Sequence, residues 1–396
     1  MSEWQKVNLG DCCEITSSKR IFFSEYVESG IPFYRSKEII EKGKGEEISH
    51  PLYISKEKYD EIKGKYGVPQ KGDLLLTAVG SLGIPFVVKD DSPFYFKDGN
   101  LVWLKHFQDI DPIFLYYWIK SENGYNALYN IAIGSAQKAL TIAAIKGYEI
   151  PLPPLQTQHR IANILSRYDS LIENYQKQIK LLEEAAQRLY KEWFVNLHFP
   201  GHENTKIVDG VPEGWEKKRL IDLVDVQYGY AFDGKLFNSS GEGMPILRIR
   251  NIPDGITSDY TSEEAQDCYI VHNGDIVVGM DGLFHINSWS GGDAYLVQRA
   301  CSFRPKEECM KGFIFQAIQE PIKFFEKTLV GATVAHLGKK HIDSIELCIP
   351  KNFELYKPFS KFYNQRQGLL SQIRLLTEAR DRLLPKLMSG EINVES

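Results

Sequence analysis

A long heptad pattern in the middle of the chain constrains its fold more than any other feature. The segment 155–194 contains no proline or glycine, and three prolines stand directly before it within residues 151–154. Two neighbouring lines of apolar or aromatic residues recur every seven positions: Ile161, Tyr168, Tyr175, Leu182 and Leu189, and Leu165, Ile172, Ile179, Ala186 and Trp193. This 3.5-residue period predicts a long helix packed lengthwise against another helix. The prolines end the preceding strand and fix the start of the helix.

The end of the chain carries the same pattern. Within the segment 357–387, the apolar line consists of Phe362, Leu369, Leu376 and Leu383, with Tyr363, Leu370 and Leu384 beside it. An ordinary amphipathic core helix is the alternative, but about 36 residues is three times the mean helix length. We therefore expect the two helices to pair as a coiled coil.

The sequence before each helix is also duplicated. Four pairs of segments match in the same order, with offsets of 197 to 213 residues. The pairs are Glu3–Ile15 with Gly214–Val226, Gly30–Ile39 with Gly243–Ile252, Lys71–Gly83 with Asn273–His285, and Gly134–Pro153 with Gly331–Pro350. Four collinear matches followed by two matched helices indicate a tandem duplication.

Each duplicated unit is predicted to mix strands and helices. The apolar runs Asp73–Val79 and Asp275–Met280 follow Gly-Asp turns and predict strands, and helices are expected from Pro112 and Gly312. The expected fold class is α+β, with a mixed α/β domain and a long helix present twice. The predicted domains are 1–150 and 213–350, the predicted helical regions are 151–197 and 351–396, and the linker is 198–212.

A tandem order of domain then helix has one economical arrangement if the helices pair. The first helix leads away from the first domain, so the second must lead back, and the pair is antiparallel. This arrangement gives an approximate two-fold axis, which suits two identical partners. At 1.5 Å per residue the first helix would span roughly 54 Å.

Composition limits the other possibilities. The net charge is −5, so a nucleic-acid surface would have to be a local patch or be shared with a partner. The six cysteines form no CxxC pair and are expected to be reduced. The sequence contains no signal peptide and no apolar stretch long enough to span a membrane, so the chain is expected in the cytoplasm. His198 and His202 have a spacing seen in metal sites, but no third ligand is nearby, so no metal site is expected.

Signatures of catalysis are missing from the sequence. It contains no Walker A loop, no GxGxxG, no GxSxG, no HExxH, and no Asn-Pro-Pro-aromatic methyltransferase signature. No pair of acidic residues has a spacing that singles it out. A binding or scaffold protein without a cofactor of its own is therefore the better interpretation.

The order of these segments resembles the specificity subunit of type I restriction–modification systems. The stretch GSAQKALTIAAIKGYEIPLPPLQTQHRIANIL, from Gly134, is similar to the family's glycine, strand, "PLPPLxEQ" turn and helix start. Thr157 stands where the family usually has Glu, and the second copy departs further, with CIPKNFELYKPFS in place of the turn. GDLLLTAVGS and GDIVVGMDG also resemble a recurrent turn, strand and loop of that family, and the likeness extends from Trp4 to about Ile392.

The resemblance implies a non-catalytic subunit with two target recognition domains, each reading half of a split double-stranded DNA site. The paired helices would separate these domains and dock two modification (methyltransferase) subunits, which carry S-adenosylmethionine. A restriction subunit with ATP- and Mg-dependent activity would join them, so that the complex methylates host DNA and cuts phage DNA.

Polar and basic loops are the candidates for DNA contact. Side chains that reach base edges give specificity, whereas lysines and arginines on phosphates supply affinity. In the first domain we predict Ser17, Ser18, Lys19, Arg20, Tyr34, Arg35, Ser36, Lys37, Thr77, Gly80, Ser81 and Lys138. In the second we predict Tyr228, Tyr230, Arg248, Arg250, Asn251, Asp281, Gly282 and His336. For each, a solvated surface position is the alternative, and for the tyrosines a half-buried one.

The long helices carry more large apolar groups than one two-helix seam requires. Some of these groups should therefore face a modification subunit. The predicted partner-binding residues are Tyr168, Leu171, Tyr175, Ile179, Trp193, Phe194, Leu369, Leu376 and Leu383.

Three alternative functions remain at this point. The chain could itself be a nuclease or methyltransferase with divergent motifs. It could be a structural adaptor that binds protein or carbohydrate, although the basic segments SKR, YRSK and RIRN favour DNA. It could also be the specificity subunit of a fused type II system, whose partner both methylates and cuts.

Overall fold

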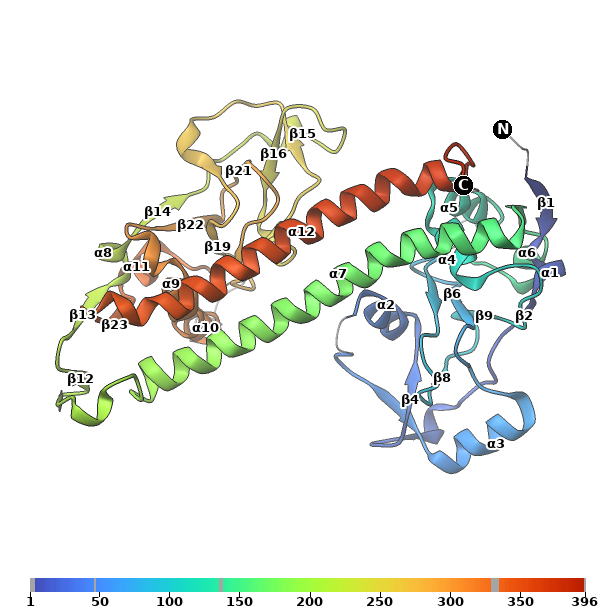
Figure 1. Ribbon diagram of the computed structural model, residues 1–396, viewed down its shortest axis with the longest axis horizontal. Helices are drawn as coiled ribbons and strands as arrows, with labels where there is room; N and C mark the ends of the chain where they lie inside the picture. The colour runs from blue at the N-terminus through green and yellow to red at the C-terminus, as the bar shows by residue number, and fades with distance from the viewer. Residues whose placement is uncertain (1–3, 46–47, 135–137, 329–334, 395–396) are drawn as a thin grey trace. The chain divides into compact units, whose positions relative to one another are not determined.

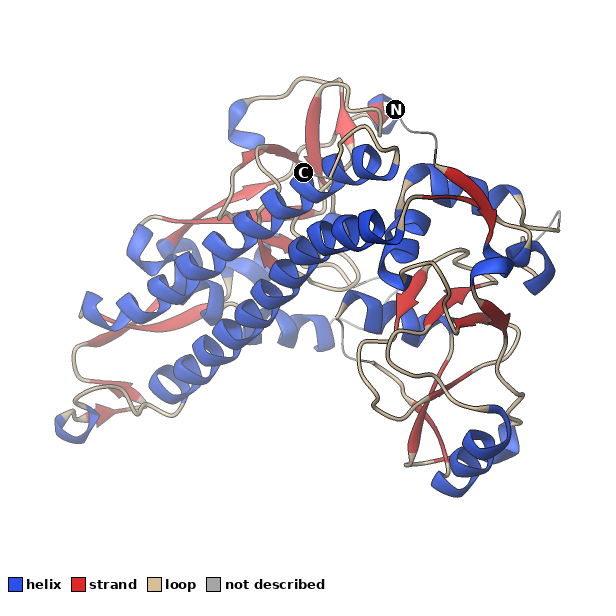
Figure 2. Cartoon of the chain, turned by 45° about the vertical axis from the view of Figure 1, so that its right-hand side comes forward, coloured by secondary structure: helices blue, strands red, loops and turns tan. Residues whose placement is uncertain are grey.

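The computed structural model describes residues 4–45, 48–134, 138–328 and 335–394. The chain divides into two compact units, one made of residues 1–173 with 376–396 and the other of residues 174–375. Both units mix helices and strands (Figure 2).

The strands of the first unit form two four-stranded sheets and a two-stranded one within the part of the chain that the structure describes. They are β1 (Gln5–Asn8), β2 (Glu14–Thr16), β3 (Tyr26–Val27), β4 (Ile31–Tyr34), β5 (Leu52–Ile54), β6 (Leu74–Thr77), β7 (Pro85–Val87), β8 (Tyr95–Phe96), β9 (Leu101–Lys105) and β10 (Glu149–Leu152). One sheet has the antiparallel order β2-β9-β6-β7, and the other, β3-β5-β4-β8, contains the parallel pair β4 and β8 (Figure 1). Strand β1 pairs with β10.

The second unit has corresponding strands. They are β11 (Ile207–Val208), β12 (Val211–Pro212), β13 (Trp215–Arg219), β14 (Val224–Tyr228), β15 (Phe237–Asn238), β16 (Met244–Leu247), β17 (Tyr260–Thr261), β18 (Ile270–Val271), β19 (Ile276–Gly279), β20 (Ile286–Ser288), β21 (Ala294–Leu296), β22 (Ala300–Pro305) and β23 (Glu346–Pro350). The sheet orders are β14-β22-β19-β20 and β15-β17-β16-β21-β18, and β16 and β21 are parallel. Strand β13 pairs with β23, and β11 with β12, inside the segment predicted as a linker.

The shorter helices of the first unit are α1 (Leu9–Cys12), α2 (Ser36–Lys44), α3 (Lys56–Tyr66), α4 (Pro112–Lys120), α5 (Glu122–Asn130) and α6 (Ile142–Lys146). In the second they are α8 (Leu220–Leu223), α9 (Lys311–Ala317), α10 (Gln319–Thr328) and α11 (Lys339–Asp343). Four of the shorter helices of the first unit recur in the second, whereas α2 and α3 have no α-helical counterpart among the described residues there. The matching strand orders and helices confirm the duplication, although parts of the first and last matched segments lie outside the described residues.

The central strand of each unit is buried on both faces, which explains its uninterrupted apolar sequence. Leu74 and Leu76 of β6 point into the main core of the first unit, and Leu75 points to the opposite face, against Phe96 and Trp103. In the second unit, β19 splits in the same way between two clusters. Alternate side chains of a strand face opposite sides of the sheet, so only a strand covered on both sides is apolar throughout.

The Gly-Asp turns before these strands have a structural role. The carboxylate of Asp73 accepts the backbone N–H of Gln70 at 2.9 Å and the indole N–H of Trp103 at 2.8 Å. Asp275 accepts the backbone N–H of His272 at 3.1 Å. Aspartate closes such turns because its side chain substitutes for a backbone acceptor. The two predicted strands are confirmed as β6 and β19.

The first long helix, α7 (Leu155–Tyr190), is anchored at its start by a buried glutamine. The Gln158 side chain accepts the backbone N–H of Asp111 at 2.9 Å and donates to the carbonyls of Asp109 at 3.0 Å and Pro153 at 2.8 Å. Asp111 in turn caps α4, whose first residue is Pro112. A fully satisfied buried amide fixes the direction in which α7 leaves the first unit. The glutamine of the "PLPPLxEQ" turn is therefore a structural residue.

In the first unit, the start of α7 packs against the end of α12 (Lys357–Met388). Arg380 of α12 donates to Asp169 of α7 at 2.6 Å, and the same carboxylate accepts the hydroxyl of Tyr117 at 2.7 Å. Leu165 and Leu387 are buried in the same core. The last described residues belong to this unit too, because Arg160 donates to the carbonyl of Val394 at 2.7 Å.

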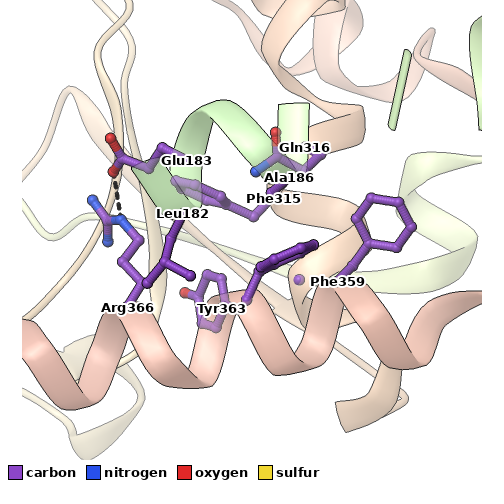
Figure 3. A pocket seen from close by; sticks show the side chains of 10 residues that line it. Leu182, Glu183, Ala186, Phe315, Gln316, Phe359, Tyr363 and Arg366 are labelled. Atoms are coloured by element: carbon purple, nitrogen blue, oxygen red, sulfur yellow. Dashed lines mark hydrogen bonds and ion pairs between the residues drawn. The ribbon is translucent and has the colours of Figure 1, made fainter. Parts of the chain in front are cut away.

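In the second unit, the end of α7 packs against the start of α12. Arg366 of α12 donates to Glu183 of α7 at 2.6 Å, and Figure 3 shows the two side chains facing each other. From Asp169 to Glu183 the chain advances fourteen residues along α7, and from Arg380 to Arg366 it goes back fourteen along α12. The pairing is therefore antiparallel. This confirms the predicted fold class, including the helix of about 36 residues that the heptad pattern indicated.

Candidate nucleic-acid interface

In the first unit, the predicted segments meet at a turn between β8 and β9, formed by residues 97–100. Lys97 donates its backbone N–H to the carbonyl of Tyr34 at 2.9 Å. The carbonyl of Asn100 accepts the backbone N–H of Ala78 at 2.8 Å and the hydroxyl of Ser36 at 3.3 Å. The strand pairing β4–β8 and β6–β9 brings these loops to one place, although Ser36 and Asn100 are 64 residues apart in the chain.

Arg20 reaches the same turn through an ion pair. Its Nε lies 3.1 Å from Oδ2 of Asp98, and its side chain remains 69% exposed. The neighbouring Lys19 donates its backbone N–H to the hydroxyl of Tyr95 at 2.7 Å, and Ser17 donates to the carbonyl of Leu101 at 3.3 Å. The run Thr16–Arg20 is thus held along the β8–β9 connection, with its arginine directed to solvent.

Some predicted residues of this unit lie inside it. Thr77 is fully buried, accepting the backbone N–H of Ile84 at 2.8 Å, and Tyr34 packs against Phe94 with ring centroids 5.1 Å apart. Ser18 is also buried. These side chains shape the loops from beneath, while the neighbouring Gly80 and Ser81 are exposed. For the exposed residues among those predicted in this unit, contact with DNA stays a prediction.

Arg35 is engaged by a buried carboxylate. Its Nε lies 3.1 Å from both oxygens of Glu38, its Nη2 also contacts that carboxylate, and its backbone N–H donates to Oε2 at 2.8 Å. Burial raises the pKa of Glu38, but the hydrogen bonds from Arg35 outweigh it and hold the pKa below its usual range. This pair caps α2 and orients Ser36 and Lys37. Elsewhere, Lys138 lies 3.6 Å above the ring of Tyr129.

The second unit has its own version of this turn, at residues 297–299 between β21 and β22. The carbonyl of Arg299 accepts the backbone N–H of Met280 at 2.8 Å, as Asn100 does for Ala78 in the first unit. Val297 donates to the carbonyl of Leu247 at 3.0 Å, and Gln298 to that of Tyr230 at 2.8 Å. The turn is one residue shorter, but three predicted segments again converge on it.

Asp281 contacts two side chains at this turn, those of Arg299 and His336. One oxygen contacts Nη1 of Arg299, and the other lies 2.5 Å from Nδ1 of His336. Burial raises the pKa of Asp281, but the hydrogen bonds from His336 and Arg299 dominate and lower it. The carboxylate therefore stays charged at neutral pH and orders both partners.

The other predicted residues of the second unit divide by exposure and pairing. The guanidinium of Arg250 forms a fork with Asp259 through Nε at 3.2 Å and Nη2 at 2.6 Å. Arg248 lies 5.3 Å above the ring of Phe237, and its backbone N–H donates to Asn251 at 2.9 Å. Tyr228 and Tyr230 are half-buried, and Gly282 adopts a left-handed backbone conformation.

Sequence reasoning missed the two turns on which the loops converge, and with them Asp98 and Arg299. The run KDGN between two apolar stretches is a turn signal. Aligning YFKDGNLVW with YLVQRACSF would have added a further matched pair of segments. Their pairing registers confirm this match, because Phe33 lies opposite Tyr95 and Ile246 opposite Tyr295.

Two exposed phenylalanines beside Arg20 were also missed. Phe22 is 61% exposed and Phe23 is 88% exposed. The signal was the dipeptide itself, two large apolar residues inside a polar loop. Apolar groups at a DNA surface contact thymine methyl groups.

The predicted partner-binding residues occupy different environments on the long helices. Leu171 is exposed, Tyr168, Tyr175, Leu369, Leu376 and Leu383 are half-buried, and Ile179 is buried. Phe194 packs on Phe313 at 4.7 Å between ring centroids, so with Trp193 it is largely engaged by the second unit's own core. Two exposed leucines, Leu181 and Leu375, were not predicted.

Three further features of the described residues are relevant to other kinds of site. Across the described ranges, no group of three or more His, Cys, Asp or Glu is placed to hold a metal ion, and no helix is both long and apolar enough to cross a membrane. The cavity in Figure 3, between Leu182, Phe315 and Tyr363, has a volume of about 10 Å³. This is at the lower limit for a single water molecule.

Comparison with known proteins gives a consistent result. The model of the family described as the type I restriction modification DNA specificity domain matches residues 1–184 and 212–374. The type I restriction enzyme MjaIX specificity subunit of Methanocaldococcus jannaschii is 28% identical over 362 residues, covering 82% of this chain and 78% of that protein. The MjaVIII specificity subunit of the same organism is 26% identical, covering 100% and 94%.

A solved structure shares the fold. The crystal structure of the type I restriction-modification system S subunit from M. genitalium superposes with a TM-score of 0.57, covering 97% of this chain and 96% of that one. The sequence identity is 19%, so the likeness concerns the fold.

Proposed function

Because the chain belongs to the type I restriction modification DNA specificity domain family, we propose that each of its two units reads one half of a bipartite DNA target. The chain contributes recognition and no catalysis. The methyl-transfer and cleavage chemistry, with S-adenosylmethionine, ATP and Mg²⁺, belongs to modification and restriction subunits that assemble on it.

The repetition of one loop cluster carries this proposal. In both units three connections meet at one turn. They are the loop after the first strand of the antiparallel sheet (β2 or β14), the segment after the parallel strand (β4 or β16) and the loop after the central strand (β6 or β19). At each turn lies an ion pair with an exposed arginine, Arg20 with Asp98 in one unit and Arg299 with Asp281 in the other. Two equivalent clusters with different residues suit two half-sites of different sequence.

The proposal is tested by coexpressing the chain with its modification subunit and mapping methylated sites across the host genome. A bipartite motif is expected. Changing Arg20 to Ala should alter recognition of one half-site only, and changing Arg248 and Arg250 together to Ala should alter the other only. Each lost bidentate base contact should cost about 1–3 kcal/mol of discrimination, whereas loss of a phosphate contact weakens all sites equally. Variants that change both half-sites together would contradict the division of labour.

Docking of modification subunits is assigned to the long helices. Leu171 lies on the part of α7 in the first unit and is 44% exposed, and Leu181 lies on its part in the second unit and is 64% exposed. Covering these two large apolar side chains with another protein would remove their apolar surface from water, which favours association. We expect Leu171→Asp or Leu181→Asp to abolish copurification with the modification subunit, since a buried unpaired charge is costly.

A matched control distinguishes docking from folding. Lys177 and Gln178 lie between these leucines, and a Gln178→Asp change adds the same charge at a position that is already polar and exposed. This control should leave copurification unchanged. Normal copurification of both leucine variants would remove these positions from the docking surface.

A further inference from the structure

We propose that Arg299 is the side chain of the second unit that recognises a guanine in its half-site, with Asp281 as the residue that positions it. This inference rests on the proposed function, since it assumes that the second unit binds DNA. The inference goes beyond the proposed function because it assigns one base contact to one residue.

The backbone at Arg299 singles this residue out. Its φ of 71° lies in the left-handed region, where non-glycine residues are uncommon and somewhat strained. The turn of the first unit uses a glycine for this conformation, Gly99, with φ of 73°. Glycine would also serve at position 299 for folding alone. An arginine there, with a side chain 66% exposed, is better explained by what its guanidinium contacts outside the unit.

The free edge of the guanidinium is what base recognition requires. Asp281 engages Arg299 through Nη1, and neither Nε nor Nη2 has a partner among the described residues. Arginine reads guanine by two parallel hydrogen bonds to O6 and N7, which need two adjacent donors. Asp281 is itself only 13% exposed and also bound to His336, so it provides a fixed support. Such support reduces the entropy lost when the side chain binds.

Comparison with the other arginines near these turns sharpens the assignment. Arg250 and Arg35 each use both Nε and Nη2 on a neighbouring carboxylate, Asp259 and Glu38, so the same edge is already occupied. Arg248 stacks on Phe237, with Cζ 5.3 Å from the ring centroid, and has no carboxylate partner among the described residues. Of these five arginines, only Arg20 resembles Arg299 in being held by a carboxylate through one nitrogen. Its Nε contacts Asp98, and neither Nη atom has a partner in the described part of the chain.

The two pairs have opposite polarity across the same turn. In the first unit, the turn supplies the carboxylate, Asp98, and the flanking loop supplies Arg20. In the second, the turn supplies Arg299 and the flanking loop supplies Asp281. Each unit therefore presents one supported arginine, but from different backbone positions. Both units thus keep an arginine–aspartate pair at the turn, although the arginine and the aspartate have exchanged places in the sequence. Fold stability alone does not explain why the pair is kept, because exposed ion pairs contribute little to stability.

The test uses the purified complex of the full chain with its modification subunits. Its target is first mapped by methylation, and binding is then measured on duplexes in which each base pair of both half-sites is substituted in turn. Arg299→Gly removes the side chain and suits the left-handed backbone, so the fold is retained. We expect it to lose discrimination at one G·C pair of the second half-site by about 5- to 150-fold, with the other positions and the first half-site unchanged.

Asp281 is tested by a double-mutant cycle. Asp281→Asn should weaken discrimination at the same base pair by less than Arg299→Gly does. The double variant should match Arg299→Gly alone, because a positioning residue has no effect once the side chain it positions is gone. Arg219→Gly is the matched control, since Arg219 is similarly exposed and ion-paired, to Asp222, but lies on β13, away from the turn.

The outcomes separate this inference from the proposed function. Uniformly weaker binding with a salt dependence lower by about one charge would show that Arg299 contacts a phosphate, which overturns base recognition. Unchanged specificity and affinity would remove Arg299 from the interface. In both cases the wild-type complex still recognises its bipartite site. A wild-type complex with no sequence preference at the second half-site would instead contradict the proposed function itself.

Discussion

Replacing Arg366 with Met should loosen one edge of the second unit while leaving the first unit unchanged. Arg366 is buried on α12 and donates to three groups at once. These are Glu183 at 2.6 Å, the side-chain oxygen of Asn287 at 2.8 Å, and the hydroxyl of Ser288. The last two belong to the edge strand β20, so this one guanidinium fastens the sheet to the long helix.

The magnitude follows from what each partner loses. A hydrogen bond that involves a charged group contributes about 1.5–3 kcal/mol. Glu183 is 43% exposed and would be hydrated once released, so its contact counts for little. Ser288 keeps a hydrogen bond from Gln367, and methionine avoids the desolvation cost of the guanidinium while filling similar space. We therefore expect a net loss of about 2–3 kcal/mol, carried mainly by the lost hydrogen bond to Asn287.

Amide hydrogen exchange measures this locally. Peptides covering β19 and β20 should exchange roughly 30- to 160-fold faster in the variant, because each 1.36 kcal/mol is a factor of ten. Peptides covering β6 and β7 in the first unit are the internal standard and should not change. Arg219→Met, which removes an exposed guanidinium from the same unit, should shift exchange by less than about fivefold. Unchanged exchange in β20, or equal acceleration in β6, would refute this account of the network.

Three further predictions concern the first unit, the second unit and the target spacing. Glu38→Gln should destabilise the chain by about 1–2 kcal/mol at pH 7. Because folding lowers the pKa of Glu38, the stability that its carboxylate contributes is present above about pH 4.3 and is lost as the pH falls through the folded pKa. Urea titrations should therefore show the free energies of unfolding of the variant and the wild type converging below about pH 4. Gly312→Ala should destabilise the second unit, because a Cβ there would lie 2.1 Å from a carbonyl oxygen of α12, whereas Gly368→Ala meets nothing within 4 Å and should raise the melting temperature. Inserting seven residues after Glu173 and seven after Leu375, at the boundary between the units on each long helix, should lengthen the spacer of the methylated motif by about two to four base pairs. Strong methylation at the original spacing would show that the helices do not measure it.

The register of the helix pair shows how far the sequence could be taken. The heptad pattern predicted both helices, and the order of domain and helix predicted that they run antiparallel. It did not show which residues face each other, because apolar stripes with a seven-residue repeat fit equally well after any shift by seven. Asp169 with Arg380 and Glu183 with Arg366 decide between these registers. Polar pairs at the margin of a seam set register where apolar residues cannot.

Candidate site residues were predicted in part, for a similar reason. Basic and polar segments such as Thr16–Arg20 were visible in the sequence, but their exposure was not. Tyr34 and Thr77 are buried because the strands that end at them are covered on both sides. A polar residue next to a strand has the same local sequence whether its side chain points inward or outward, so only packing distinguishes the two.

By itself the sequence determined the periodicity, the duplication and the family resemblance, since each is a pattern along the chain. Tertiary structure alone decided which loops meet. Arg20 and Asp98, which form an ion pair, are 78 residues apart in the chain. Asp281 contacts both Arg299 and His336, and His336 lies 55 residues beyond Asp281. These contacts follow from strand pairing between distant segments, which depends on the burial of whole sheets and leaves no local signal at the residues that it brings together.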